Sequence, residues 1–151
     1  METKGIRIAD KINNIVSVEL PDILQEISNG QFFYWSILFS YGTGKLSEGQ
    51  SLQDWEKQIK EATDGLLVTW EELNALSHKF WDLYDITIIA SKDRSIIKRY
   101  SNDREMYEKC DIVIEMIDSG YWEVFSKDSE LINKLEKKFK ATEPLEPDFE
   151  K

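Results

Sequence analysis

Alternating apolar and polar positions are clearest between residues 110 and 126. Ile112, Ile114 and Met116 occur at every second position, the spacing typical of a strand whose two faces differ. Asp118-Ser119-Gly120 predicts a tight turn with Gly120 in the left-handed conformation, and residues 121–126 predict a second strand. The pattern therefore predicts an antiparallel strand pair near the C-terminal end of the chain.

A three-residue turn at 118–120 fixes which residues of the two strands face each other. Ile117 lies opposite Tyr121, and the same register places Glu115 directly opposite Glu123. Like charges in that position destabilise a sheet. Three explanations stay open: a Lys or Arg from a neighbouring strand or helix, a two-residue Ser119-Gly120 turn that changes the register, or a cation supplied by a partner or metal.

Helical spacing appears in three other stretches, each preceded by a residue that favours an N-cap. Ser51 with Asp54 and Thr69 with Glu72 have capping-box spacing, and Asp128 precedes an apolar stripe. These signals predict helices over 51–62, 69–81 and from 128 onward, with a shorter helix beginning near Pro21.

The remaining apolar stretches predict further strands and their turns. Strands are expected over 5–9, 32–40 and 84–90, with 32–40 buried on both faces, while Gly42-Thr43-Gly44 is typical of a turn. Together these elements predict one α+β domain over residues 1–140: a mixed sheet of about five strands with a C-terminal hairpin, and helices packed on the sheet. Residues 141–151, acidic and containing prolines, are expected to form a flexible tail.

The charge of the chain changes the expected choice of partner. Its 151 residues include 29 acidic and 19 basic side chains, for a net charge of −10. Nucleic acids and anionic membranes bind basic patches, so neither is an expected partner. An acidic surface instead favours a basic protein partner.

The sequence shows neither a membrane-spanning segment nor a signal peptide, and this bears on the expected localisation. No apolar run approaches the roughly 20 residues that span a bilayer, and the first residues do not resemble a signal peptide. Cys110 is the single cysteine, which rules out an internal disulfide. We therefore expect a cytoplasmic protein.

Residues with catalytic potential are few. His78 is the single histidine, and one His with one Cys cannot make a zinc site. No G-x-S-x-G elbow or phosphate-binding glycine loop occurs, and Cys110 is typical of a small buried hydrophobe. We therefore expect no cofactor, no metal and no catalytic residue, although Glu115 and Glu123 could serve as the acid–base pair of a small carboxylate-dependent hydrolase.

Four segments carry a resemblance to a known group of proteins. These segments, KGIRIADKINNIV, ELPDILQEISNGQFFYWSILF, TWEELNALSHKFWDLYDITIIASKD and CDIVIEMIDSGYWEVFSKDSELINKL, cover most of residues 4–140. In this order they resemble an uncharacterised family of small single-domain bacterial hypothetical proteins. The resemblance implies one compact domain and implies no catalytic residues.

The absence of catalytic motifs and the negative charge together predict a binding protein rather than an enzyme. The most concrete hypothesis is an immunity or antitoxin-type inhibitor that covers a basic surface, such as the active site of a toxin. A regulatory interaction domain unrelated to toxins fits the sequence as well. The residues expected to contact the partner are Asp82, Asp85, Glu115, Asp118, Trp122 and Glu123.

Overall fold

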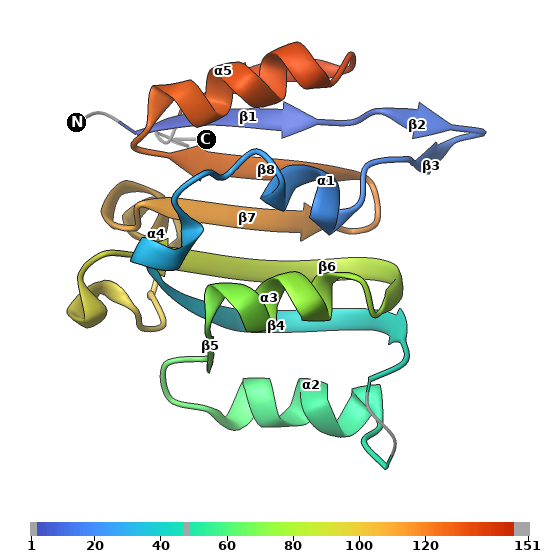
Figure 1. Ribbon diagram of the computed structural model, residues 1–151, viewed down its shortest axis with the longest axis vertical. Helices are drawn as coiled ribbons and strands as arrows, with labels where there is room; N and C mark the ends of the chain where they lie inside the picture. Colours follow the sequence, from blue (N-terminus) through green and yellow to red (C-terminus); the bar gives the residue numbers. More distant parts are fainter. Residues whose placement is uncertain (1–2, 47–48, 147–151) are drawn as a thin grey trace.

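A seven-stranded antiparallel sheet forms the centre of a single α+β domain. The computed structural model describes residues 3–46 and 49–146. The strands lie in the order β5-β4-β6-β7-β8-β1-β9, and every neighbouring pair is antiparallel (Figure 1). The sheet is thus wider than the five strands expected, and antiparallel rather than mixed. Its strands are β1 (Lys4–Ile8), β4 (Tyr34–Gly44), β5 (Leu66–Val68), β6 (Phe80–Ser91), β7 (Ile112–Ile117), β8 (Tyr121–Ser126) and β9 (Thr142–Leu145).

Two short strands form a separate ribbon after β1. β2 (Lys11–Ile12) pairs with β3 (Ile15–Val16), and the ribbon projects beyond the end of the sheet (Figure 1). Asn13 and Asn14 connect the two strands with φ of 53° and 66°. Positive φ at both central residues is the geometry that matches the natural twist of a two-residue hairpin, and asparagine tolerates it better than most residues.

Helices cover the two faces of the sheet unequally. The α-helices are α1 (Leu20–Leu24), α2 (Leu52–Glu61), α3 (Trp70–Ser77), α4 (Asp103–Lys109) and α5 (Ser129–Lys138), with 3₁₀ turns η1 (Gly30–Phe32) and η2 (Arg94–Ile96). Helices α1, α2, α3 and α5 contribute to the larger core cluster on one face, whereas α4 packs on the other. None of the helices in residues 3–46 and 49–146 has the length and hydrophobicity needed to cross a membrane.

Alternation along the strands separates two hydrophobic cores. Ile112, Ile114 and Met116 on β7 face the larger core, as the sequence predicts, together with Trp122 and Val124 on β8. The opposite side of the same strands builds a smaller core beneath α4, with Val113, Phe125, Met106, Tyr107 and Cys110 among its buried members. Glu115 and Glu123 also lie on this side, because they alternate along β7 and β8 with residues of the larger core.

The predicted helix starts at Ser51, Thr69 and Asp128 are confirmed. The side chain of each accepts a hydrogen bond from a backbone N–H in the first turn, Asp54 at 3.1 Å, Glu72 at 3.1 Å and Glu130 at 3.0 Å respectively. Capping of this kind satisfies N–H groups that have no partner within the helix.

The end of the third helix differs from the prediction. Helix α3 stops at Ser77 rather than 81, and β6 starts at Phe80 rather than at 84. The β-favouring side chains of Phe80 and Trp81 continue the sheet alongside β4, whose Gly42-Thr43-Gly44 segment is strand and not turn. A Cβ on Gly42 would lie 2.3 Å from the carbonyl oxygen of Asp82, so this glycine permits a close approach of the two strands.

The turn between β7 and β8 also differs in detail. Asp118 and Ser119 have φ of 48° and 57°, so they and not Gly120 adopt the left-handed conformation. The Gly120 N–H donates to the Ile117 carbonyl at 2.8 Å. Positive φ at two consecutive residues matches the natural twist of paired strands. This match explains why Asp118 and Ser119 adopt the left-handed conformation, although glycine adopts it more easily.

Part of the expected flexible tail belongs to the sheet. Thr142–Leu145 forms β9, which pairs with β1 and makes that edge of the sheet, so β7 and β8 lie in its interior. The last residues of the predicted tail, 147–151, lie outside the described residues.

The close contact of Gly30 with Trp70 gives a first stability prediction. A Cβ on Gly30 would lie 2.3 Å from the Trp70 ring, which stacks on Trp35 at 5.1 Å between centroids. We expect Gly30→Ala to lower the free energy of unfolding by about 1–3 kcal/mol, the usual cost of overpacking. Chemical denaturation measures this, and the matched change Gly49→Ala, where nothing lies within 4 Å but φ is 81°, separates crowding from backbone strain.

Candidate functional site

Glu115 and Glu123 lie directly opposite each other on β7 and β8, in the predicted register. Their residues are only 9% and 6% exposed. Arg7 on β1 resolves the repulsion, because its Nε and Nη2 donate to one carboxylate oxygen of Glu123 at 2.9 and 2.7 Å. Of the three explanations left open, a basic side chain from a neighbouring strand is therefore the one observed.

Glu115 accepts hydrogen bonds from two hydroxyl groups, and within residues 3–46 and 49–146 it has no direct cationic partner. The hydroxyl of Tyr107 on α4 donates to its Oε1 at 2.5 Å, and the Thr87 hydroxyl lies 3.3 Å from its Oε2. Burial raises the pKa of Glu115 to about 7, although the Tyr107 hydrogen bond acts in the opposite direction. Burial favours the neutral form of the Glu115 carboxyl, so this group gains a proton more readily than an exposed glutamate.

This arrangement makes the two glutamates part of the interior rather than of a contact surface. A shallow hollow reaches Glu123, Arg7 and Tyr107, but Glu115 is not among the residues that line it. Trp122 is likewise interior: it is 1% exposed, and its indole N–H donates to the Val18 carbonyl at 2.8 Å. Glu115 and Glu123 therefore hold the sheet together, whereas Trp122 is anchored in the interior and forms part of the floor of an adjacent groove.

The other three predicted residues gather at one end of the sheet. The Asp85 carboxylate accepts a hydrogen bond from the backbone N–H of Asp118 at 2.9 Å, which ties the start of β6 to the β7–β8 turn. Ser119 reinforces this link by donating its N–H to the Tyr84 carbonyl at 2.8 Å. Asp82 lies three residues earlier on β6, within hydrogen-bonding reach of the Thr43 hydroxyl at 3.4 Å. We call Asp82, Asp85 and Asp118 the acidic end of the sheet.

An apolar groove opens beside the acidic end, with a volume of about 350 Å³. The β2–β3 ribbon and the start of α1 form one wall, and the start of β6 forms the other. Met116 and Trp122 on β7 and β8 contribute to its floor. Among the described residues that line it, the charged ones are both acids, Glu19 and Asp82.

The rim of this groove carries large exposed hydrophobic side chains. Ile15 on the ribbon is 70% exposed and Trp81 on β6 is 71% exposed, and both line the groove. Ile12, the neighbour of Ile15 across the ribbon, is 67% exposed. Exposed apolar side chains grouped around an apolar groove are typical of an interaction site. The candidate site is therefore the groove together with the acidic end.

His78 and Cys110 take no part in this site. His78 is exposed at the C-cap of α3, and Cys110 is 1% exposed in the second core. Burial raises the pKa of the Cys110 thiol to about 12, which makes it a poor nucleophile at neutral pH. No group of three His, Cys, Asp or Glu side chains suited to a metal ion occurs within residues 3–46 and 49–146.

Sequence reasoning missed three residues that matter here. Arg7 gives no local signal, because its partner Glu123 is 116 positions away. The pattern around Ile15 indicates a short strand, and Trp81 lies at the end of the predicted 69–81 helix, where its side chain could reach the surface. Neither pattern indicates that the two side chains border one groove.

No match to this chain is found among protein-family models, curated proteins or solved structures.

Proposed function

We propose that this protein binds a basic protein partner and blocks the partner's functional surface, in the manner of an immunity or antitoxin-type inhibitor. The observation that carries the proposal is the apolar groove whose charged lining residues are acids and whose rim exposes Ile15 and Trp81. The net charge of −10 adds a long-range attraction toward a cationic surface.

The arrangement suggests how such a partner would be held. An apolar side chain of the partner would enter the groove over Met116 and contact Trp81 on the rim. Lysine or arginine side chains flanking it would pair with Glu19 and Asp82 at the groove, and with Asp118 on the adjoining turn. A buried apolar anchor gives affinity, whereas charge pairs around it give fast and selective association.

The revised set of contact residues follows from accessibility. Asp82, Asp85 and Asp118 stay in the proposed set, and Glu19, Ile15 and Trp81 join it. Glu115 and Glu123 leave it because their carboxylates are buried and bound by Tyr107 and Arg7, so their roles are structural in this proposal. Trp122 stays as part of the groove floor, with its indole N–H bound to the Val18 carbonyl.

A charge-reversal experiment tests the proposal. The wild-type protein and the variant Asp82→Lys/Asp118→Lys are immobilised, exposed to a lysate of the source organism, and the retained proteins are identified by mass spectrometry. We expect a basic protein that is retained by the wild type, lost from the variant, and released as salt concentration rises. Inhibition of that partner's activity by the soluble wild type, at stoichiometric concentration, then tests the inhibitory role.

A matched control separates location from total charge. Glu61→Lys/Glu136→Lys makes the same change in net charge on exposed positions of α2 and α5. The proposal requires this control to retain the partner like the wild type. Equal loss of the partner from both double variants, or equal retention by both, contradicts a site at the acidic end.

A further inference from the structure

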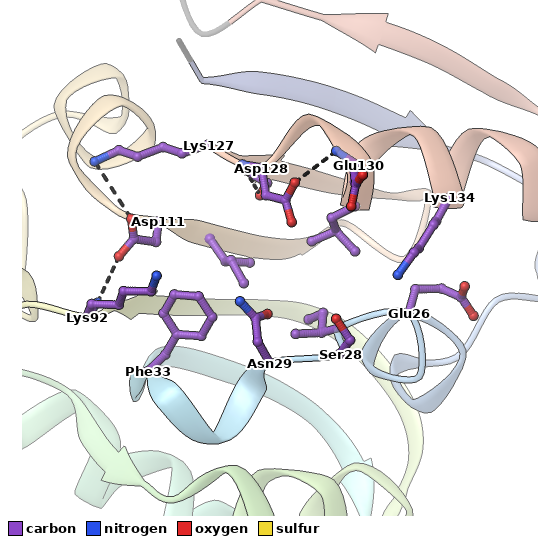
Figure 2. Close-up of a pocket in the computed structure, with 14 residues that line it drawn as sticks. Glu26, Ser28, Asn29, Phe33, Lys92, Asp111, Lys127, Asp128, Glu130 and Lys134 are labelled. Carbon is purple, nitrogen blue, oxygen red and sulfur yellow. Dashed lines mark hydrogen bonds and ion pairs between the residues drawn. The ribbon is translucent and has the colours of Figure 1, made fainter. Parts of the chain in front are cut away.

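A second cavity lies at the opposite end of β7 and β8 from the groove, with a volume of about 270 Å³ (Figure 2). It lies between the segment that links α1 to η1 and the start of α5, and it opens to solvent beside the exposed side chains of Asp128 and Lys134. Ile27, Ile112 and Leu131, all buried, form its apolar interior. The Phe33 ring adds an aromatic wall beside Lys92, whose amine lies 5.8 Å from the ring centroid.

Some of the charged groups around this cavity already have partners in the protein. Asp111 accepts a hydrogen bond from the backbone N–H of Lys92 at 2.8 Å and lies 4.0 Å from the Lys127 amine. Glu26 pairs with Lys138 at 3.1 Å. These groups shape the rim but are already engaged, so they offer less to a ligand.

The side chains of three other residues are better placed to bind a ligand: Asn29, Asp128 and Lys134. Lys134 and the side-chain amide of Asn29 have no ion pair or hydrogen bond within residues 3–46 and 49–146. Asp128 uses Oδ1 to cap α5 through the Glu130 N–H at 3.0 Å, which leaves its second oxygen available. Figure 2 shows the Asp128 carboxylate and the Asn29 amide on facing sides of the cavity, with the Lys134 side chain reaching down from α5.

The cavity combines available carboxylates, available amines and an apolar interior, and this combination favours one kind of ligand. An anion alone would meet Asp128 and Glu130, and a cation alone would meet Lys92 and Lys134. A small molecule that carries both charges satisfies both sides. The volume lies just below the usual range for ligand pockets, roughly 300–1,000 Å³, which favours a small metabolite.

We infer that this cavity binds a small zwitterion with an apolar arm, the chemistry of an apolar α-amino acid such as leucine. Its ammonium group pairs with Asp128, its carboxylate with Lys134 and the Asn29 amide, and its side chain contacts Ile27 and Leu131. This inference stands apart from the proposed function, because the cavity and the groove lie at opposite ends of the same strands.

Isothermal titration of the full chain with L-leucine tests the inference, with four analogues that each lack one charge. Isoamylamine lacks the carboxylate and isocaproate lacks the ammonium group. Leucine amide represents the N-terminal end of a peptide, and N-acetyl-leucine represents the C-terminal end. We expect leucine to bind at least about tenfold more tightly than any analogue. Binding of leucine amide or N-acetyl-leucine as tight as that of leucine would identify a peptide end as the ligand and overturn the assignment to a free amino acid.

Variants then locate the binding. Asp128→Asn removes the charge but keeps a residue that caps helices well, and Lys134→Gln removes the free amine. Each is expected to weaken leucine binding at least about tenfold, whereas Lys137→Gln, an exposed change on the same helix, leaves it unaltered. Absence of heat with leucine at millimolar concentration, or binding that all three variants preserve, overturns the inference.

Discussion

Replacing Arg7 with methionine is expected to destabilise the protein by about 3 kcal/mol, the lower end of the cost of breaking a buried ion pair. The change leaves the Glu123 carboxylate, 7% exposed, without its two charge-assisted hydrogen bonds and directly opposite Glu115. We take the lower end of the range because the Arg7 side chain is itself 36% exposed, so water can partly replace it. Urea denaturation monitored by tryptophan fluorescence measures the loss.

The double variant Arg7→Met/Glu123→Gln serves as the control for this prediction. It removes the buried charge together with its partner, so most of the lost stability should return. If the single variant loses less than about 1 kcal/mol, the ion pair does not determine the stability of this part of the sheet.

Raising the pH from about 4.5 to about 8 is expected to cost the wild-type protein about 3 kcal/mol through Glu115 alone. Burial raises the pKa of Glu115 to about 7 in the folded protein, whereas the ordinary value is 4.5. The folded state therefore binds a proton that the unfolded state has lost, and stability contributed by this group falls as the pH rises through 7. Denaturation curves at several pH values measure the effect.

Glu115→Gln isolates this contribution from the other acids of the chain. Glutamine keeps an acceptor for the Tyr107 hydroxyl and a donor toward Thr87, so the variant resembles the protonated form. We expect the variant to match the wild type near pH 4.5 and to be more stable by about 3 kcal/mol near pH 8. A constant difference between the two proteins across this range contradicts a raised pKa at Glu115.

Local sequence signals predicted the elements whose causes are themselves local. The helix starts at Ser51, Thr69 and Asp128 depend on groups within three residues, and they are confirmed. The alternation in β7 likewise determines which of its side chains face the helices. A register shift of one residue would turn Ile112, Ile114 and Met116 away from the larger core.

Features set by distant partners were not predictable in the same way. β6 begins at Phe80 because it pairs with the end of β4, where Gly42 lets the backbones approach closely. β9 exists because β1 offers a free edge to it, and a tail rich in proline and acids gives little sign of this. The strand count and the outline of the sheet therefore required the tertiary structure.

The sequence predicted only part of the candidate site, because the rest of the site depends on contacts between distant segments. Asp82, Asp85 and Asp118 are acids near turns or strand ends, and acids in such places are usually exposed. The predicted register pairs Trp122 with Met116 on the apolar face of the strand pair, and the structure places it there, against the larger core. The groove itself joins the β2–β3 ribbon to β6, a contact between segments some 65 positions apart for which periodicity gives no signal.

Titration of the isotopically labelled protein with a short peptide, in which leucine is flanked by lysines, tests the central claim most directly. Backbone amide shifts are measured by NMR at low salt, where weak charge pairing is strongest. We predict shifts concentrated in 15–20, 80–84 and 116–122, which line the groove and the acidic end, and we predict their loss in Asp82→Lys/Asp118→Lys. Shifts centred on α2 or α4, or shifts that survive the charge reversal, would contradict it.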